Sequence, residues 1–147
     1  MEKLTRNLKI ASIVVLVFTA STFIDLLTQV IFDTFKNVTI PAGAPENVVL
    51  IAQIVLITVS FILLLPAIYI GIRGLQIAKN PTPAKGHIVW GAIILAFAVI
   101  DLIGVIISIA TVGSALAFIG NLCGALLDVV IYFEYVKYAK DVAVACQ

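Results

Sequence analysis

The sequence predicts an all-α integral membrane protein with four transmembrane helices, on the basis of its composition, its hydrophobic segments and the placement of its charges. Of the 147 residues, 63% are hydrophobic and 12% are charged, and the mean hydropathy is +1.21. Soluble domains have about 45–50% apolar and about 25% charged residues. The chain holds four long apolar stretches separated by short polar segments, and about 20 apolar residues suffice for a helix that crosses a bilayer. We therefore expect one four-helix transmembrane domain over residues 1–147.

The first predicted span covers residues 10 to about 35 and follows a short basic lead that contains Lys3, Arg6 and Lys9. The lead, the apolar run and the small residues Thr19-Ala20-Ser21 also fit a signal peptide with its cleavage region. The apolar run continues beyond these small residues, so we favour a span and keep the signal peptide as the alternative.

The second predicted span covers about residues 48–77. It follows a polar connector at residues 36–46, in which Pro41 and Pro45 favour a turn. At 1.5 Å per residue, a helix of this length exceeds a hydrocarbon layer of about 30 Å. Its last turns, which carry Arg73, should therefore project into water.

The third and fourth predicted spans cover residues 88 to about 109 and about 116–138. The breaker-rich run Asn80-Pro81-Thr82-Pro83 ends the second span before them, and Thr111-Val112-Gly113-Ser114 predicts a tight turn between them. Residues 139–147 are expected to form a short tail.

Positive charge falls almost entirely on one predicted side of the membrane. Eight of the nine Lys and Arg residues lie on the side that carries both termini and the connection between spans two and three, and only Lys36 lies on the other. Cytoplasmic loops carry an excess of Lys and Arg, so we expect both termini in the cytoplasm, at a bacterial-type plasma (inner) membrane. Near the same interface we expect His87 and an aromatic belt made of Trp90, Tyr132, Tyr135 and Tyr138.

A short pattern recurs along the chain. The tripeptides Ile24-Asp25-Leu26 and Ile100-Asp101-Leu102 lie 76 residues apart, and each ends 17 residues after a lysine, Lys9 or Lys85. The recurrence predicts two duplicated hairpins (2+2) related by an axis along the membrane normal, as in parallel-repeat transporters. A coincidence between two apolar helices is the alternative.

Each predicted helix places a polar side chain at a similar depth, toward the outer leaflet. On the first span Gln29 shares a helix face with Asp25, and on the fourth span Asp128 shares a face with Asn121, because residues four and seven apart lie on the same side. The residues expected to bind or conduct a proton or cation are Asp25, Gln29, Gln53, Asp101, Asn121 and Asp128.

The three aspartates have no basic residue in the deep part of any predicted span. An ionised Asp near the bilayer centre costs roughly 2.5–3.5 kcal/mol. The carboxyl groups must therefore be protonated, hydrogen-bonded by amides and hydroxyls, hydrated in a cavity, or neutralised by a cation. The first two states need only helix packing, whereas the last two describe a proton or cation pathway.

Other residues carry weaker signals. Arg73 and Glu134 lie at comparable depth on spans two and four, which predicts a structural ion pair, and Cys123 and Cys146 differ too much in depth to form a disulfide. We find no catalytic, metal-binding or cofactor motif and no basic patch for nucleic acid. We therefore expect a protein that is not an enzyme and has no cofactor, with the lipid bilayer as its surroundings.

Two functions from different classes fit these observations. The first is a proton or cation channel or transporter subunit that acts as a homo-oligomer, since four helices alone enclose little lumen. The second is a non-catalytic membrane interaction protein, such as an accessory subunit, assembly factor or immunity protein, whose polar layer binds a span of a partner membrane protein. Replacement of Asp25 and Asp101 by Asn should abolish transport under the first hypothesis and largely spare assembly under the second.

Overall fold

The computed structural model describes residues 1–31, 46–112 and 115–147, although some side chains within these helices, including those of Gln29 and Gln53, lie outside the description. The described residues form four helices and no strand. They are α1 (Glu2–Ile31), α2 (Glu46–Lys79), α3 (Gly86–Val112) and α4 (Ala115–Ala145). The prediction of an all-helical fold is confirmed.

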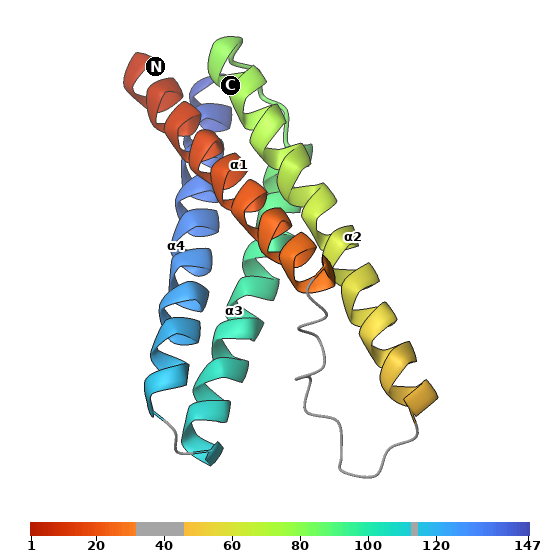
Figure 1. Ribbon diagram of the computed structural model, residues 1–147. Coiled ribbons are helices and arrows are strands. Elements are labelled where there is room, and N and C mark those ends of the chain that lie inside the picture. Colours follow the sequence, from red (N-terminus) through yellow and green to blue (C-terminus); the bar gives the residue numbers. More distant parts are fainter. Residues whose placement is uncertain (32–45, 113–114) are drawn as a thin grey trace.

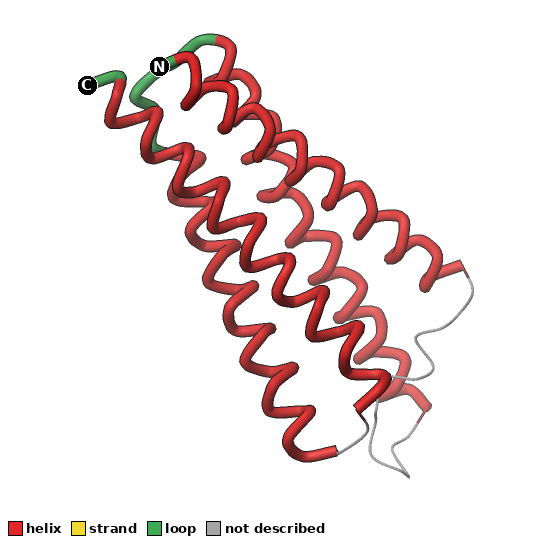
Figure 2. The backbone as a smooth tube through the Cα atoms, turned by 90° about the vertical axis from the view of Figure 1, so that its left-hand side faces the viewer, coloured by secondary structure: helices red, strands yellow, loops and turns green. Residues whose placement is uncertain are grey.

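The helices form two antiparallel pairs, in which α1 packs mainly on α2 and α3 mainly on α4. Both termini lie at one end of the bundle together with the connection between α2 and α3 (Figure 1), and Figure 2 shows the same grouping from the side. We call this the terminal end and the opposite one the far end. The two pairs meet at the terminal end and diverge toward the far end (Figure 1).

The helices extend beyond the predicted spans at the terminal end. Helix α1 begins at Glu2 instead of residue 10, and α4 continues to Ala145 instead of ending near residue 138. Leu8 and Val142, on these extensions, are fully buried. The prediction of a short tail after the last span is wrong, because hydropathy marks the length that crosses lipid and not the length that packs into a core.

Three of the helices contain segments long and apolar enough to cross a membrane. Within the described residues these segments are Glu2–Thr28, Gly86–Ile107 and Ile119–Ala145. Many large apolar side chains on the outside of the bundle are exposed. These features are compatible with an integral membrane protein, in which such side chains contact lipid.

The densest packing lies near the terminal end. The largest fully buried side chains come from all four helices and are Leu8, Ser12, Val15, Ile70, His87, Tyr135 and Val142. The Tyr135 hydroxyl donates a hydrogen bond of 2.7 Å to the Ile70 carbonyl, which ties α4 to α2. Gly74 and Gly91 face the same ring, and a Cβ atom added at either would meet Tyr135 ring carbons at 2.8 Å and 3.2 Å, respectively. Small residues therefore let the backbones of α2 and α3 approach this tyrosine closely.

Two aromatic residues expected in a lipid-facing belt are instead inside the bundle. Tyr135 and Tyr132 are buried, as is His87, which lies edge-on to Tyr135 with ring centroids 6.3 Å apart. Trp90 is exposed and Tyr138 is half-buried. The belt prediction is wrong for Tyr132 and Tyr135, because both lie on the face of α4 that packs against the other helices.

The inner face of α4 loses its cover toward the far end. On α4, Tyr135 is buried, Asp128 is half-buried and Asn121 is exposed, although the three residues share one face of the helix. On α1, Thr19 and Leu26 lie seven residues apart on one face and are both buried, whereas Asp25 lies on another face and is exposed. The gradient along α4 follows from the divergence of the two helix pairs, which leaves an opening between them.

Candidate functional site

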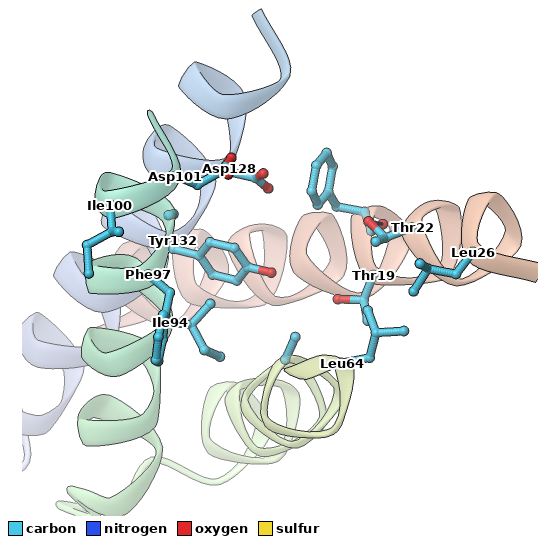
Figure 3. Close-up of a pocket in the computed structure, with 13 residues that line it drawn as sticks. Thr19, Thr22, Leu26, Leu64, Ile94, Phe97, Ile100, Asp101, Asp128 and Tyr132 are labelled. Atoms are coloured by element: carbon cyan, nitrogen blue, oxygen red, sulfur yellow. Dashed lines mark hydrogen bonds between the residues drawn. The ribbon is translucent and has the colours of Figure 1, made fainter. Parts of the chain in front are cut away.

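A cavity of about 510 Å³ lies where the helix pairs begin to separate. All four helices contribute to its wall. Its polar lining consists of Thr19 and Thr22 from α1, Asp101 from α3, and Asp128 and Tyr132 from α4. Its apolar lining includes Phe18, Leu26, Leu64, Ile94 and Phe97 (Figure 3).

Two carboxyl groups lie side by side at one wall of this cavity (Figure 3). Asp101 comes from α3 and Asp128 from α4, and the antiparallel packing of these helices brings the two together although they lie 27 residues apart in the sequence. They interact electrostatically, and none of the described residues that line the cavity is basic. Two adjacent carboxylates repel each other, so the cavity favours the uptake of positive charge, as a proton or as a cation.

Hydroxyl groups complete the polar lining. Thr19 donates its hydroxyl hydrogen to the Val15 carbonyl at 2.7 Å, and Thr22 donates to the Phe18 carbonyl at 3.1 Å. Because each hydrogen is used on the backbone, the threonine oxygens are left as acceptors. The Tyr132 side chain points across the cavity toward Thr19, and the two side chains interact (Figure 3). The lining therefore offers oxygen acceptors from α1, α3 and α4.

The structure brings together only some of the residues predicted to form the polar layer. Asp101, which is exposed, and Asp128, which is half-buried, line the cavity, whereas Asp25 and Asn121, which are also exposed, are not among its lining residues. The side chains of Gln29 and Gln53 lie outside the described residues. Of the residues predicted to bind or conduct a proton or cation, the described structure therefore brings only Asp101 and Asp128 together at the cavity.

Arg73 and Glu134 have partners on their own helices. Arg73 donates a hydrogen bond of 2.8 Å to the Gln76 side chain, and Glu134 lies 3.8 Å from the Lys137 ammonium group. Both pairs join residues three apart, which lie next to each other on a helix surface. The structure does not bring Arg73 and Glu134 together as an ion pair.

The sequence analysis did not assign Thr19 or Tyr132 to the site. Thr19 was treated as a small residue of a possible cleavage region, and Tyr132 as part of the aromatic belt. One signal was available for Tyr132, because it lies four residues after Asp128 and therefore one turn away on the same face. No corresponding signal identifies Thr19, whose place at the cavity depends on how α1 crosses the other helices.

Comparison of the chain with protein-family models, with curated proteins and with solved structures found no match. Within the part of the chain that the structure describes, no group of three or more His, Cys, Asp or Glu side chains is placed to hold a metal ion.

Proposed function

We propose that this chain is a small membrane protein that binds and moves protons or cations through the cavity between its two helix pairs. The observation that carries the proposal is the adjacent pair Asp101 and Asp128, which lines a cavity built by all four helices and has no basic partner there. Unpaired carboxyl groups at membrane depth are costly and are commonly retained for proton or ion movement. The threonine and tyrosine hydroxyls at the same cavity would help to bind the incoming charge.

The proposed topology has four spans, with α2 as the remaining span. Helix α2 has 34 residues and is mostly apolar, which supports a span with its last turns in water. Both termini and the α2–α3 connection share one end of the bundle (Figure 1), and eight of the nine basic residues belong to that side in sequence. We therefore assign the terminal end to the cytoplasm of a bacterial-type inner membrane.

The packing supports a pathway that is closed at the cytoplasmic end and open toward the far end. Tyr135, His87 and Leu8 are fully buried near the terminal end, whereas Asn121 and Asp25, nearer the far end, are exposed. Transport would require the terminal end to open in turn, by a rocking movement of one helix pair against the other. A homo-oligomer would cover the exposed polar residues near the far end.

The proposal is tested by proton and alkali-cation flux into liposomes that contain the purified protein. The test variant is Asp101→Asn with Asp128→Asn, which keeps the size and polarity of both side chains and removes their ionisation. Asp141→Asn is the matched control, since it makes the same chemical change at an exposed position of α4 outside the cavity. We expect flux in wild type, flux close to wild type in the control, and loss of flux in the double variant. Absence of flux in wild type at every pH and potential would refute transport of protons or alkali cations.

A non-catalytic interaction protein is the second candidate, and the exposed face near the far end favours it. Asp25 is exposed on α1, although a carboxylate that faces lipid is unfavourable. On α4, Gly120 and Gly124 surround Asn121 in a GxxxG pattern, and a Cβ atom at either glycine would meet nothing within 4 Å. Such a face admits close approach of another helix. If this is the function, Asp25→Asn or Gly120→Leu would weaken co-purification with a partner span, while the cavity variant would not.

Neither candidate function depends on the proposed duplication of the two hairpins. Asp25 and Asp101 occupy equivalent positions in the sequence pattern, but Asp101 lines the cavity and Asp25 does not. A common origin would therefore have been followed by different use of the two aspartates.

A further inference from the structure

We propose that the preferred ligand of the cavity is a monovalent organic cation with an apolar, aromatic body, which enters from the hydrocarbon layer. This inference rests on the proposed function and specifies its substrate class. It depends on the volume of the cavity, the kind of side chains that line it and the exposure of its rim.

The volume of the cavity suits a small organic molecule. Sites for such ligands enclose about 300–1,000 Å³ and are mostly apolar, with a few polar groups that fix orientation. The cavity measures about 510 Å³, and most of the residues that line it are apolar. A site built only to hold a bare metal ion surrounds it closely with six or more oxygen ligands when the ion is Ca²⁺ or Mg²⁺. An apolar lining of this extent has no role in such a site.

Aromatic rings from three helices line the cavity together with the carboxyl pair. Phe18 comes from α1, Phe97 from α3 and Tyr132 from α4. Figure 3 shows the Tyr132 ring next to the carboxyl pair, with its hydroxyl group pointing toward Thr19. A cation is attracted both to the face of an aromatic ring and to a carboxylate. The lining thus provides two kinds of attraction for a positive centre and an apolar surface for its substituents.

The cavity has a buried floor and an exposed rim. Thr19 and Tyr132 are 3% and 7% exposed, whereas Phe97 and Ile100 at the rim are 53% and 63% exposed. In a chain that spans the bilayer, an exposed apolar rim at this position contacts lipid tails. An organic cation with an aromatic body partitions toward the membrane and can reach the rim sideways, without crossing the packed terminal end.

Charge balance allows a monovalent ligand to bind together with a proton. Asp101 and Asp128 together carry two negative charges when both are ionised. A bound monocation neutralises one of these charges, and the other carboxylate can take up a proton. One organic monocation and one proton therefore neutralise the pair. Release of the cation with uptake of a second proton restores neutrality, so the same pair can couple proton movement to cation movement.

The test is equilibrium binding of tetraphenylphosphonium, a permanent monocation with an aromatic body, to the full-length protein in detergent micelles. Triphenylphosphine oxide serves as the neutral aromatic control. We expect wild type to bind the cation at least about tenfold more tightly than the neutral compound, because only the cation interacts with the carboxylates. The double variant Asp101→Asn, Asp128→Asn should lose about tenfold or more in affinity.

A second variant separates the aromatic contribution from the charge. Phe97→Leu keeps an apolar side chain and removes the ring, and should weaken cation binding about two- to tenfold without changing binding of the neutral compound. Asp141→Asn, outside the cavity, should bind like wild type. Circular dichroism and gel filtration of each variant verify that the fold is retained.

Three results would overturn the inference: equal affinity for the neutral compound, unchanged affinity in the double variant, or no binding to wild type. Proton and alkali-cation flux, measured on the same proteins in liposomes, separates this inference from the proposed function. Flux that depends on Asp101 and Asp128 without phosphonium binding refutes the organic substrate and keeps the transport function. Phosphonium binding that depends on these residues, in a protein without any flux or phosphonium transport, supports the site and refutes transport.

Discussion

Gly74 lies at the closest crossing of the bundle, and its replacement by alanine gives the sharpest test of the packing described above. A Cβ atom at this position would meet the Ser12 hydroxyl oxygen and, at 2.8 Å, the Tyr135 Cε2 atom. Carbon atoms in favourable contact lie about 3.5–4.0 Å apart. Ser12 and Tyr135 must therefore move, or α2 must shift away from α1 and α4.

Neither neighbour of Gly74 can move easily. The Tyr135 hydroxyl is bonded to the Ile70 carbonyl at 2.7 Å, and its ring lies against Gly91 on the opposite helix. The Ser12 hydroxyl donates to the Leu8 carbonyl at 2.7 Å in a fully buried position. Overpacking of a dense core costs about 1–3 kcal/mol, and the upper half of this range applies because both neighbours are buried and bonded.

Alanine also has a favourable effect, which reduces the net change. In a helix interior alanine is preferred over glycine by about 1 kcal/mol. Gly74→Ala should therefore lower the free energy of unfolding by about 1–2 kcal/mol, the difference between the two effects. The assay is unfolding in rising mole fractions of sodium dodecyl sulfate, followed by circular dichroism of the purified protein.

Gly124→Ala is the matched control for this measurement. It makes the same chemical change in α4, but its Cβ atom would meet nothing within 4 Å, so only helix propensity acts and the free energy of unfolding should stay equal or rise by up to about 1 kcal/mol. The two variants thus change stability in opposite directions. If Gly74→Ala proved as stable as Gly124→Ala, the close crossing of α1, α2 and α4 would be refuted.

Two further predictions concern the terminal end and the topology. Tyr135→Phe should lower the free energy of unfolding by about 1 kcal/mol in the same assay, because it removes one net hydrogen bond, and an unchanged value would show that the bond to the Ile70 carbonyl does not stabilise the bundle. Cys146 lies near the terminal end, which we propose to be cytoplasmic, and Cys123 is exposed nearer the far end. An impermeant maleimide should therefore label Cys123→Ala, and not Cys146→Ala, in inside-out vesicles. Labelling of Cys123→Ala in intact cells or right-side-out vesicles would reverse the proposed topology.

The sequence predicted the helices better than their ends. Apolar runs and proline-rich breakers locate four helices because both signals depend on local chemistry. Leu8 and Val142 lie outside the predicted spans, among charged neighbours, and yet are fully buried. Their burial depends on contact between the ends of α1 and α4, which are far apart in the sequence, and no local pattern reports such a contact.

The candidate site was predicted only in part, because the exposure of its residues also depends on contacts between segments far apart in the sequence. Helical periodicity places Tyr135, Asp128 and Asn121 on one face of α4. Two of the three predicted aspartates, Asp101 and Asp128, line the cavity. Periodicity does not reveal which part of a face is covered. Asn121 and Asp128 differ in exposure only because the other helix pair has moved away at the level of Asn121.

How much of the inner face of α4 is covered by the other helix pair depends on the angle at which the two pairs cross. That angle is fixed near the terminal end, where the small residues Gly74 and Gly91 accept the large ring of Tyr135. Close approach at one end and divergence at the other place Asp101 and Asp128 beside an open cavity. A change at Gly74 should therefore alter the cavity as well as stability, because the same packing that holds the terminal end together determines how far the helices separate at the carboxyl pair.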